Sequence, residues 1–322
     1  MTVQNRASEP LKLGISACLM GAEVRFNGGH KQPHLCSRVL SEHFQFVPVC
    51  PEVGIGMGTP REPIRLVGES HAPRAIGTVE RDKDVTDALR TYGERMATEL
   101  NGICGYIFMQ QSPSCGLERV KVYQANGMPT PGGGRGIYAQ AFCARHPDLP
   151  VEEDGRLNDA VLRENFLTRV YAYARWQQLL QSGLTRQSIL EFHSGYKYQL
   201  MATDPVQYKA LGQMLGNLGQ FDLQELAPRY FSQLMQALKK CATRRTHSNV
   251  LQHLCGYLKK ALSGADKQEV SQLIHQYRNG IVPLVVPLTL LKHHFRHHPD
   301  AYIARQVYLQ PYPENLSLRN AI

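Results

Sequence analysis

The stretch Leu11-Lys-Leu-Gly-Ile-Ser16 begins the part of the chain that decides the fold. It is a short, largely apolar run that is typical of a β-strand, and residues 46–49 form a second one. Between them, residues 33–44 carry apolar side chains at helical spacing. Parallel strands need a crossover connection, which is usually a helix, so two strands joined through a helix are expected to lie parallel. The sequence therefore predicts a βαβ unit.

The same alternation continues along the first half of the chain. A helical pattern over residues 84–100 is followed by a strand pattern over 105–109 and a further helical pattern over 138–145. This order favours a parallel sheet with right-handed crossovers. We predict an α/β domain with a Rossmann-like, three-layer arrangement.

From residue 159 onward the periodicity is helical only. Pro205, Pro228 and Pro283 are predicted in first helical turns, and Gly183 and Gly264 at helix ends. The predicted helices cover residues 159–181, 185–202, 205–215, 228–241, 247–262, 265–277 and 283–297. We expect an all-α domain over residues 156–322, after an α/β domain over residues 1–155.

Length and composition agree with two ordinary globular domains. The chain has 322 residues, and one hydrophobic core rarely grows past about 250–300 residues. The longest apolar run, residues 281–291, is about half of the roughly 20 residues that span a bilayer, and prolines interrupt it. The first ten residues lack the apolar segment of a secretion signal. We expect a cytoplasmic protein without a membrane partner.

The positive charge is concentrated in the second half. Residues 1–155 carry 16 Lys and Arg against 17 Asp and Glu, whereas residues 156–322 carry 20 against 10. This asymmetry favours a polyanionic partner, first of all nucleic acid, although a solvated basic surface is the alternative. Paired cations at predicted helix ends are candidates for phosphate contacts: Lys239, Lys240, Arg244, Arg245, Lys259 and Lys260.

Three of the eight cysteines share a position relative to the predicted strands. Cys18, Cys50 and Cys115 each follow a strand, and the carboxyl ends of parallel strands lie at one edge of a sheet. No pair forms Cys-x-x-Cys, which argues against a zinc ribbon or a thioredoxin-type pair. Three converging thiolates fit a zinc site, a lone catalytic cysteine, or an iron–sulfur cluster that lacks one protein ligand.

Polar side chains and glycines accompany these cysteines. Glu52 lies two residues from Cys50, and Ser112 lies three residues before Cys115. We identify Arg61, Ser114 and Gly28 as candidate substrate-binding residues. The residues thus predict a metal or cluster site with acid–base groups beside it.

The motifs that carry these residues resemble the thiouracil desulfurase (TudS) family. They are Ile15-Ser-Ala-Cys18-Leu-Met-Gly21, Val49-Cys-Pro-Glu52-Val53, Pro60-Arg-Glu-Pro63 and Ser112-Pro-Ser-Cys115-Gly116. The resemblance implies a [4Fe–4S] cluster held by Cys18, Cys50 and Cys115, with one iron open for the substrate sulfur. It also implies that Glu52 and Ser112 are catalytic.

The helical half, which includes Glu191-Phe-His193-Ser-Gly-Tyr-Lys197, is similar to the YbgA-type domain. The combination resembles the tRNA 4-thiouridine desulfidases (RudS), which implies removal of sulfur from 4-thiouridine in tRNA by a non-redox cluster. One alternative is a desulfidase of free thiolated bases such as thiouracil. Another is a non-catalytic nucleic-acid-binding protein with a structural zinc. The roles of His193, Lys197 and the histidines between His293 and His298 stay open.

Overall fold

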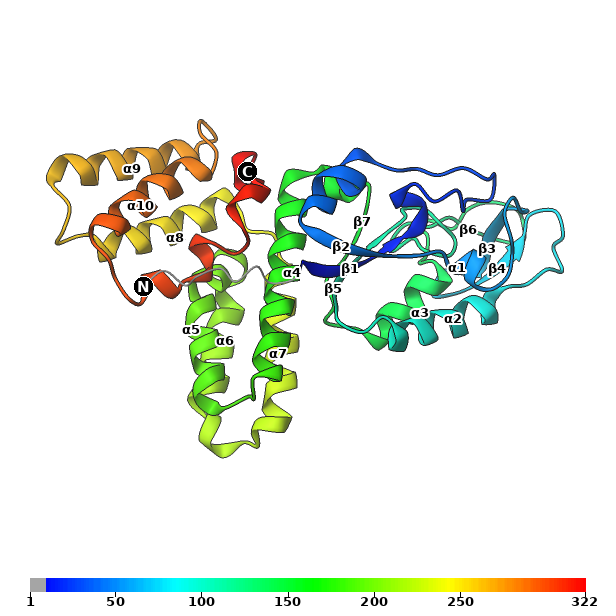
Figure 1. The fold of residues 1–322 in the computed structure, drawn as a ribbon, viewed down its shortest axis with the longest axis horizontal. Coiled ribbons are helices and arrows are strands. Elements are labelled where there is room, and N and C mark those ends of the chain that lie inside the picture. Colours follow the sequence, from blue (N-terminus) through cyan, green and yellow to red (C-terminus); the bar gives the residue numbers. More distant parts are fainter. Residues whose placement is uncertain (1–9) are drawn as a thin grey trace. The chain divides into compact units, whose positions relative to one another are not determined.

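The computed structural model of the protein describes residues 10–322 (Figure 1). The chain divides into two compact units, and the boundary in the sequence lies between Asn158 and Asp159. The sequence-based boundary stands at residue 155. We call the first the N-terminal unit and the second the helical unit.

A four-stranded parallel sheet forms the centre of the N-terminal unit, as predicted. Its order is β2-β1-β5-β7, and every neighbouring pair runs parallel. The chain places β2 on one side of β1 and then continues on the other side with β5. Such a change of direction produces a crevice at the carboxyl ends of the strands. The strands are β1 (Leu11–Ser16), β2 (Phe44–Val49), β5 (Ile103–Phe108) and β7 (Val151–Glu153).

One face of this sheet carries an aromatic core. Tyr106 and Phe108 of β5 stack with ring centroids 4.0 Å apart, and both contact Tyr138 and Phe142. Gly14 of β1 makes room for them, because a Cβ atom there would lie 2.3 Å from the Tyr106 ring. The covering helices are α2 (Thr86–Glu99) and α3 (Ile137–Arg145), which pack against each other.

The predicted helix over residues 33–44 is irregular. A π-helix (Leu35–Val39) is followed by a 3₁₀ turn (Leu40–Glu42). Ser37 and Ser41 donate from their hydroxyls to backbone carbonyls of Pro33 and Ser37, at 3.1 and 2.9 Å. Such local bonds compete with the regular α-helical ladder, and periodicity alone does not reveal them.

A second, three-stranded sheet was not predicted. Its order is β4-β3-β6, with strands β3 (Ile64–Glu69), β4 (Ala72–Gly77) and β6 (Val122–Tyr123). Pro73 lies inside β4, a residue that argues against a strand in the sequence. The structure accommodates it because β4 is an edge strand, where a missing amide donor costs no ladder bond. The short helix α1 (Pro51–Gly54) and strand β7 were also not predicted.

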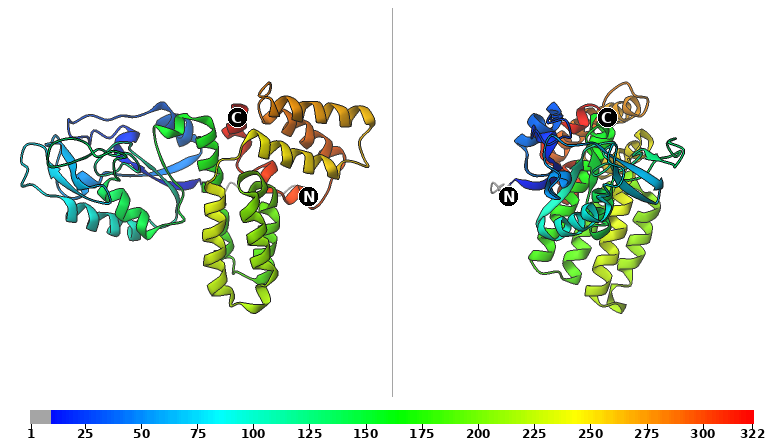
Figure 2. Two further views of the ribbon diagram at one scale, coloured as in Figure 1. Left: turned by 180° about the vertical axis from the view of Figure 1, so that it is seen from behind. Right: turned by 90° about the vertical axis from the view of Figure 1, so that its right-hand side faces the viewer.

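The helical unit contains seven α-helices within the described residues. Helices α4 to α7 run alongside one another in the three views of Figures 1 and 2, and α8 to α10 contact each other as a second group. They are α4 (Ala160–Gln181), α5 (Arg186–Thr203), α6 (Pro205–Gly216), α7 (Leu223–Lys239), α8 (Arg244–Tyr257), α9 (Gly264–Arg278) and α10 (Val285–His297). The all-helical prediction is confirmed.

Three helix-end predictions were wrong. Pro283 lies before α10, because the N-cap residue of that helix is Leu284. The other two predictions concern Pro228 and Gly264. Pro228 lies inside α7, because the helix begins earlier, where the Asp222 side chain accepts a hydrogen bond from the Gln224 amide. Gly264 is the first residue of α9, because Ser263 forms a capping box with Asp266. In both places an N-cap side chain sets the helix start, which outweighs the local preference of proline or glycine.

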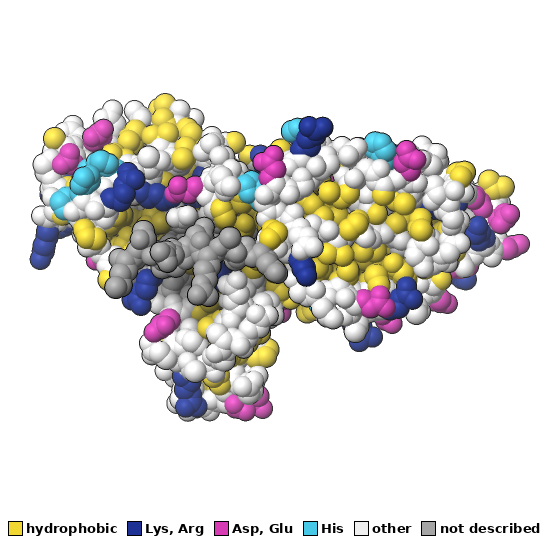
Figure 3. Space-filling model, in the orientation of Figure 1, with side chains coloured by type: hydrophobic (Ala, Val, Ile, Leu, Met, Phe, Trp, Pro, Cys, Tyr) yellow, Lys and Arg dark blue, Asp and Glu magenta, His cyan; other side chains and the backbone are white. Residues whose placement is uncertain are grey.

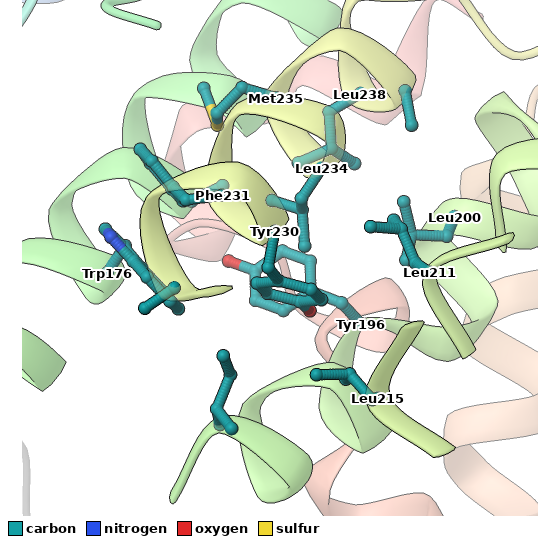
Figure 4. Packing of buried hydrophobic residues seen from close by; sticks show 14 of the residues in the cluster. Trp176, Tyr196, Leu200, Leu211, Leu215, Tyr230, Phe231, Leu234, Met235 and Leu238 are labelled. Carbon is teal, nitrogen blue, oxygen red and sulfur yellow. The ribbon is translucent and has the colours of Figure 1, made fainter. Parts of the chain in front are cut away.

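Large aromatic side chains fill the core that helices α4, α5, α6 and α7 share (Figure 4). Trp176 stacks on Phe231 with centroids 4.8 Å apart, and Tyr196 and Tyr230 lie at the centre of the cluster. The chain then closes the unit with the 3₁₀ turns Ile303–Arg305, Val307–Leu309, Glu314–Leu316 and Leu318–Asn320. No helix in the described part of the chain is both long and apolar enough to span a membrane.

Candidate functional site

A cavity of about 290 Å³ lies where the segments following β1, β2 and β5 come together. This is the carboxyl edge of the parallel sheet, where α/β proteins bind their ligands. Its lining contains the ends of β1 and β2, the start of α1, residues 109–113 and Cys115. The chain order therefore brings three distant segments to one place.

The cavity brings together the three cysteines that follow strands. Cys18 lies in the 3₁₀ turn Ala17–Met20, Cys50 is the N-cap residue of α1, and Cys115 lies in the turn after β5. Cys18 and Cys115 are buried and Cys50 is half-buried. The other cysteines do not line this cavity: Cys36, Cys104, Cys143, Cys241 and Cys255.

Burial controls the protonation of these thiols. It raises the pKa of Cys18 to about 11, with the neighbouring Cys50 adding to the shift. Burial likewise raises the pKa of Cys50, and raises that of Cys115 well above its ordinary range. Cys18, Cys50 and Glu52 all add to the shift at Cys115, so these groups are electrostatic neighbours. Thiolates here need a compensating positive charge, which bound metal supplies by displacing the protons.

The donor set suits a cluster in which each thiolate binds its own iron. Among residues 10–322, no three His, Cys, Asp or Glu side chains are close enough to ligate one metal ion. A cubane has a looser requirement, because its cysteine ligands bind different irons. Cys18, Cys50 and Cys115 line one cavity and offer the soft thiolate donors that such a cluster uses.

Glu52 is held beside the thiols by bonds to both of its carboxylate oxygens. Arg61 donates from Nε and Nη2 to Oε2, at 2.8 and 2.6 Å. Ser114 donates from its hydroxyl to Oε1 at 2.7 Å. The Glu52 side chain is only 14% exposed and that of Arg61 4%, so this ion pair is largely shielded from solvent. The carboxylate is therefore fixed in orientation at the cavity wall.

Arg61 also ties neighbouring loops together. Its Nη2 donates to the carbonyl of Val24 at 2.9 Å, and its Nη1 donates to the carbonyl of Gly58 at 2.9 Å. All these bonds use the planar fork of the guanidinium, which a lysine could not reproduce. Arg61 lines the cavity as predicted, and its nitrogens hold the site together.

Ser112 lines the cavity and shapes the turn that carries Cys115. Its Oγ accepts the backbone amides of Ser114 and Cys115, at 3.2 and 3.0 Å. With both bonds accepted, the hydroxyl keeps its own proton as a donor. The hydroxyl can therefore donate to a molecule in the cavity.

Two predicted substrate-binding residues lie outside the lining. Ser114 is fully buried behind Glu52. Gly28 occupies a tight turn with φ of +76°, in which its amide donates to the carbonyl of Arg25. That turn carries Arg25 and Phe26, which do line the cavity. Ser114 and Gly28 thus act on the site through their neighbours.

Sequence reasoning missed several residues of this region. Phe26 gives the cavity an apolar wall and is 40% exposed. Figure 3 shows hydrophobic side chains gathered on the visible face of the N-terminal unit. Asp154, directly after β7, accepts the Gln110 amide at 2.9 Å and pairs with Lys31 at 2.7 Å. Its position directly after a strand could have indicated that it lies near the site, but strand β7 was not predicted from the sequence.

The paired cations of the helical unit form two groups. Lys239, Lys240, Arg244 and Arg245 lie around the start of α8, whereas Lys259 and Lys260 follow its end. A helix of this length, 14 residues, spans about 20 Å. Lys240 pairs with Asp204 at 2.5 Å, and Arg244 donates to the carbonyl of Tyr277 at 3.0 Å. These two cations therefore also stabilise the fold.

Two family descriptions match this chain. "2-Thiouracil desulfurase" matches residues 13–154, and "Protein of unknown function (DUF1722)" matches residues 197–313. The first match contains all the residues of the cavity described above. The second lies entirely within the helical unit.

Similar proteins cover the two halves separately. "Uncharacterized protein YbgA" of Escherichia coli (strain K12) is 31% identical over 49% of this chain and 94% of its own length. "Uncharacterized protein YbbK" of Bacillus subtilis (strain 168) is 32% identical over 45% of this chain and 97% of its own. A solved structure of a [4Fe-4S]-dependent thiouracil desulfidase, TudS, is 28% identical, with a TM-score of 0.37, over 46% of this chain and 93% of that one.

Proposed function

Because this chain belongs to the 2-thiouracil desulfurase family through residues 13–154 and to the DUF1722 (YbgA-type) family through its helical part, we propose that it removes sulfur from 4-thiouridine in tRNA. The products would be uridine and hydrosulfide. One observation carries the proposal: three thiols and an oriented carboxylate line a single cavity at the sheet edge.

Cys18, Cys50 and Cys115 would hold a [4Fe–4S] cluster through their thiolates. The described lining contains no fourth cysteine and no histidine, so the fourth iron of such a cluster would have no cysteine or histidine ligand from this cavity. When bound, the cluster supplies a Lewis-acidic iron with an affinity for the sulfur of a thiocarbonyl group.

Glu52 is the proposed general base for the attacking water. Its Oε1 and Oε2 accept bonds from Ser114 and Arg61, so the carboxylate is held in one orientation at the cavity wall. Each oxygen has further lone pairs, so a water can still donate to it. A positioned base of this kind contributes about 10²–10⁴-fold to a rate.

Ser112 is the proposed hydrogen-bond donor to the substrate or the water. The two amides that bind its Oγ fix the oxygen, and its proton remains available. The net reaction adds one water to the C4 carbon and releases sulfur as hydrosulfide. A C–S bond breaks and a C–O bond forms, and no electron is gained or lost overall.

One feature supports RNA rather than a free base as substrate. The second half of the chain carries an excess of ten positive charges, for which a free-base enzyme has no need. The cavity, at about 290 Å³, admits a base-sized group, and its size suits a free base as well as a base of RNA that is unstacked from its neighbours.

The test begins with protein purified without oxygen. We expect about four irons and four acid-labile sulfides per chain, as a cubane requires. Sulfur release is then measured on tRNA that carries 4-thiouridine and on free 4-thiouracil. Preference for tRNA supports the proposal, whereas equal or better turnover of the free base would support the free-base alternative. Zinc without labile sulfide would favour the non-catalytic binding protein.

A further inference from the structure

A second cavity, of about 260 Å³, is lined only by residues of the helical unit. One wall is α10, and the opposite wall is the closing segment over residues 309–320. Lys292 and Arg296 project from α10, four residues apart and therefore on one helix face. Arg319 enters from the closing segment.

Arg319 is buried in this wall with one nitrogen unused. Its Nε lies 3.2 Å from Oε1 of Glu164, and its Nη1 donates to the carbonyl of Tyr308 at 2.6 Å. The residue is 7% exposed, and its Nη2 has no hydrogen-bond partner among residues 10–322. A buried guanidinium nitrogen without a partner is uncommon, and a bound acceptor would satisfy it.

The lining has more cationic than anionic side chains, and one of its cations, Arg319, is also ion-paired with Glu164, which is not part of the lining. The lining contains three cations and a single carboxylate, that of Glu314, whose Oε1 lies 2.6 Å from Nζ of Lys292. Lys292, and at longer range Arg296, hold the pKa of Glu314 below its usual value. The Glu314 side chain is 68% exposed, so it can turn into solvent when a stronger anion takes its place.

We propose that this cavity binds the phosphate group of a nucleotide, with Lys292, Arg296 and Arg319 as its cationic donors. Guanidinium forks match the geometry of phosphate oxygens. Amide side chains of Gln310 and Asn320 lie in the same lining and can bind the edge of a base. Leu288, Leu309 and Leu318 add an apolar wall for a ring. The inference does not depend on the desulfidase proposal.

Calorimetric titration of the full-length protein tests the site with UMP, inorganic phosphate and uridine. We expect UMP and phosphate to bind, and uridine to bind more weakly than UMP. Lys292→Ala and Arg296→Ala should each weaken UMP binding about 10–100-fold, as expected for the loss of a charged hydrogen bond. Arg278→Ala removes an exposed cation of α9 outside the cavity and should leave UMP binding unchanged.

The phosphate could belong to a free nucleotide or to an RNA chain, and tRNA binding by the same variants separates the two. If Arg296→Ala binds tRNA more weakly, and if UMP competes with tRNA for the wild-type protein, the bound phosphate belongs to the RNA backbone. Unchanged tRNA binding with lost UMP binding identifies a free nucleotide. Arg296 is exposed, so its substitution does not endanger the fold. Absence of UMP and phosphate binding, or equal affinities in wild type and Arg296→Ala, would overturn the proposal, whatever the desulfurase activity.

Discussion

Replacing Glu52 by glutamine removes the charge of the proposed base while preserving its size. Only one oxygen remains, although the native carboxylate accepts from Arg61 on one side and from Ser114 on the other. The remaining oxygen is expected to face Arg61, because two N–H donors would otherwise meet. The amide then faces Ser114, whose hydroxyl can accept instead of donating.

The structure sets the size of the stability change. Removing one partner of a buried ion pair costs about 3–5 kcal/mol. We expect the lower end, about 3 kcal/mol, because the Glu52 side chain is 14% exposed at the cavity. At about 2–4 °C per kcal/mol for a domain of this size, the melting temperature of the N-terminal unit should fall by about 6–12 °C.

The substitution should also slow catalysis. Turnover should fall about 10²–10⁴-fold, the contribution of a positioned general base. Iron and labile sulfide should stay at the wild-type level, because the three cysteines are intact. The assay follows loss of the thiocarbonyl absorbance below the melting temperature of the variant, with metal content measured on the same sample.

Glu62→Gln is the matched control. Glu62 lies outside the cavity lining, and its carboxylate accepts the amides of Val79 and Glu80. The same substitution there should leave turnover unchanged. Wild-type turnover by Glu52→Gln at full iron content would refute the assignment of Glu52 as the base. Loss of iron in that variant would show instead that Glu52 serves cluster assembly.

Three further outcomes follow from the cavity, the charge distribution and the packing of the sheet. The variants Cys18→Ser, Cys50→Ser and Cys115→Ser should each lose bound iron, which iron analysis measures. Cys104→Ser, at the opposite end of β5, should retain iron. Binding of tRNA should weaken about 10³–10⁵-fold between 50 and 200 mM salt if about 6–10 phosphates are contacted, and salt-independent binding would contradict a role for the helical unit. Gly14→Ala should destabilise the N-terminal unit by about 1–3 kcal/mol in denaturant unfolding, because the new Cβ would lie 2.3 Å from the Tyr106 ring. The control Gly256→Ala should not destabilise the protein, because the space around Gly256 is open.

Local sequence patterns predicted the secondary structure where a single helix or strand has a clear periodicity of its own. The helices of the second half and three strands of the parallel sheet follow from periodicity, which depends only on neighbouring residues. The hairpin of β3 and β4 did not, because Pro73 argues against a strand unless the edge position is known. Pro228 was misplaced because an N-cap at Asp222 starts the helix upstream.

The sequence by itself determined that Cys18, Cys50 and Cys115 would meet, because the carboxyl ends of parallel strands share one edge. Only the tertiary structure decided which hydroxyl binds Glu52. The motif was interpreted with Ser112 as the catalytic serine, but it is Ser114 that binds the carboxylate 62 positions away, whereas the Ser112 hydroxyl accepts amides of its own turn. Contacts between side chains so distant along the chain depend on how loops pack, and no local pattern encodes that packing.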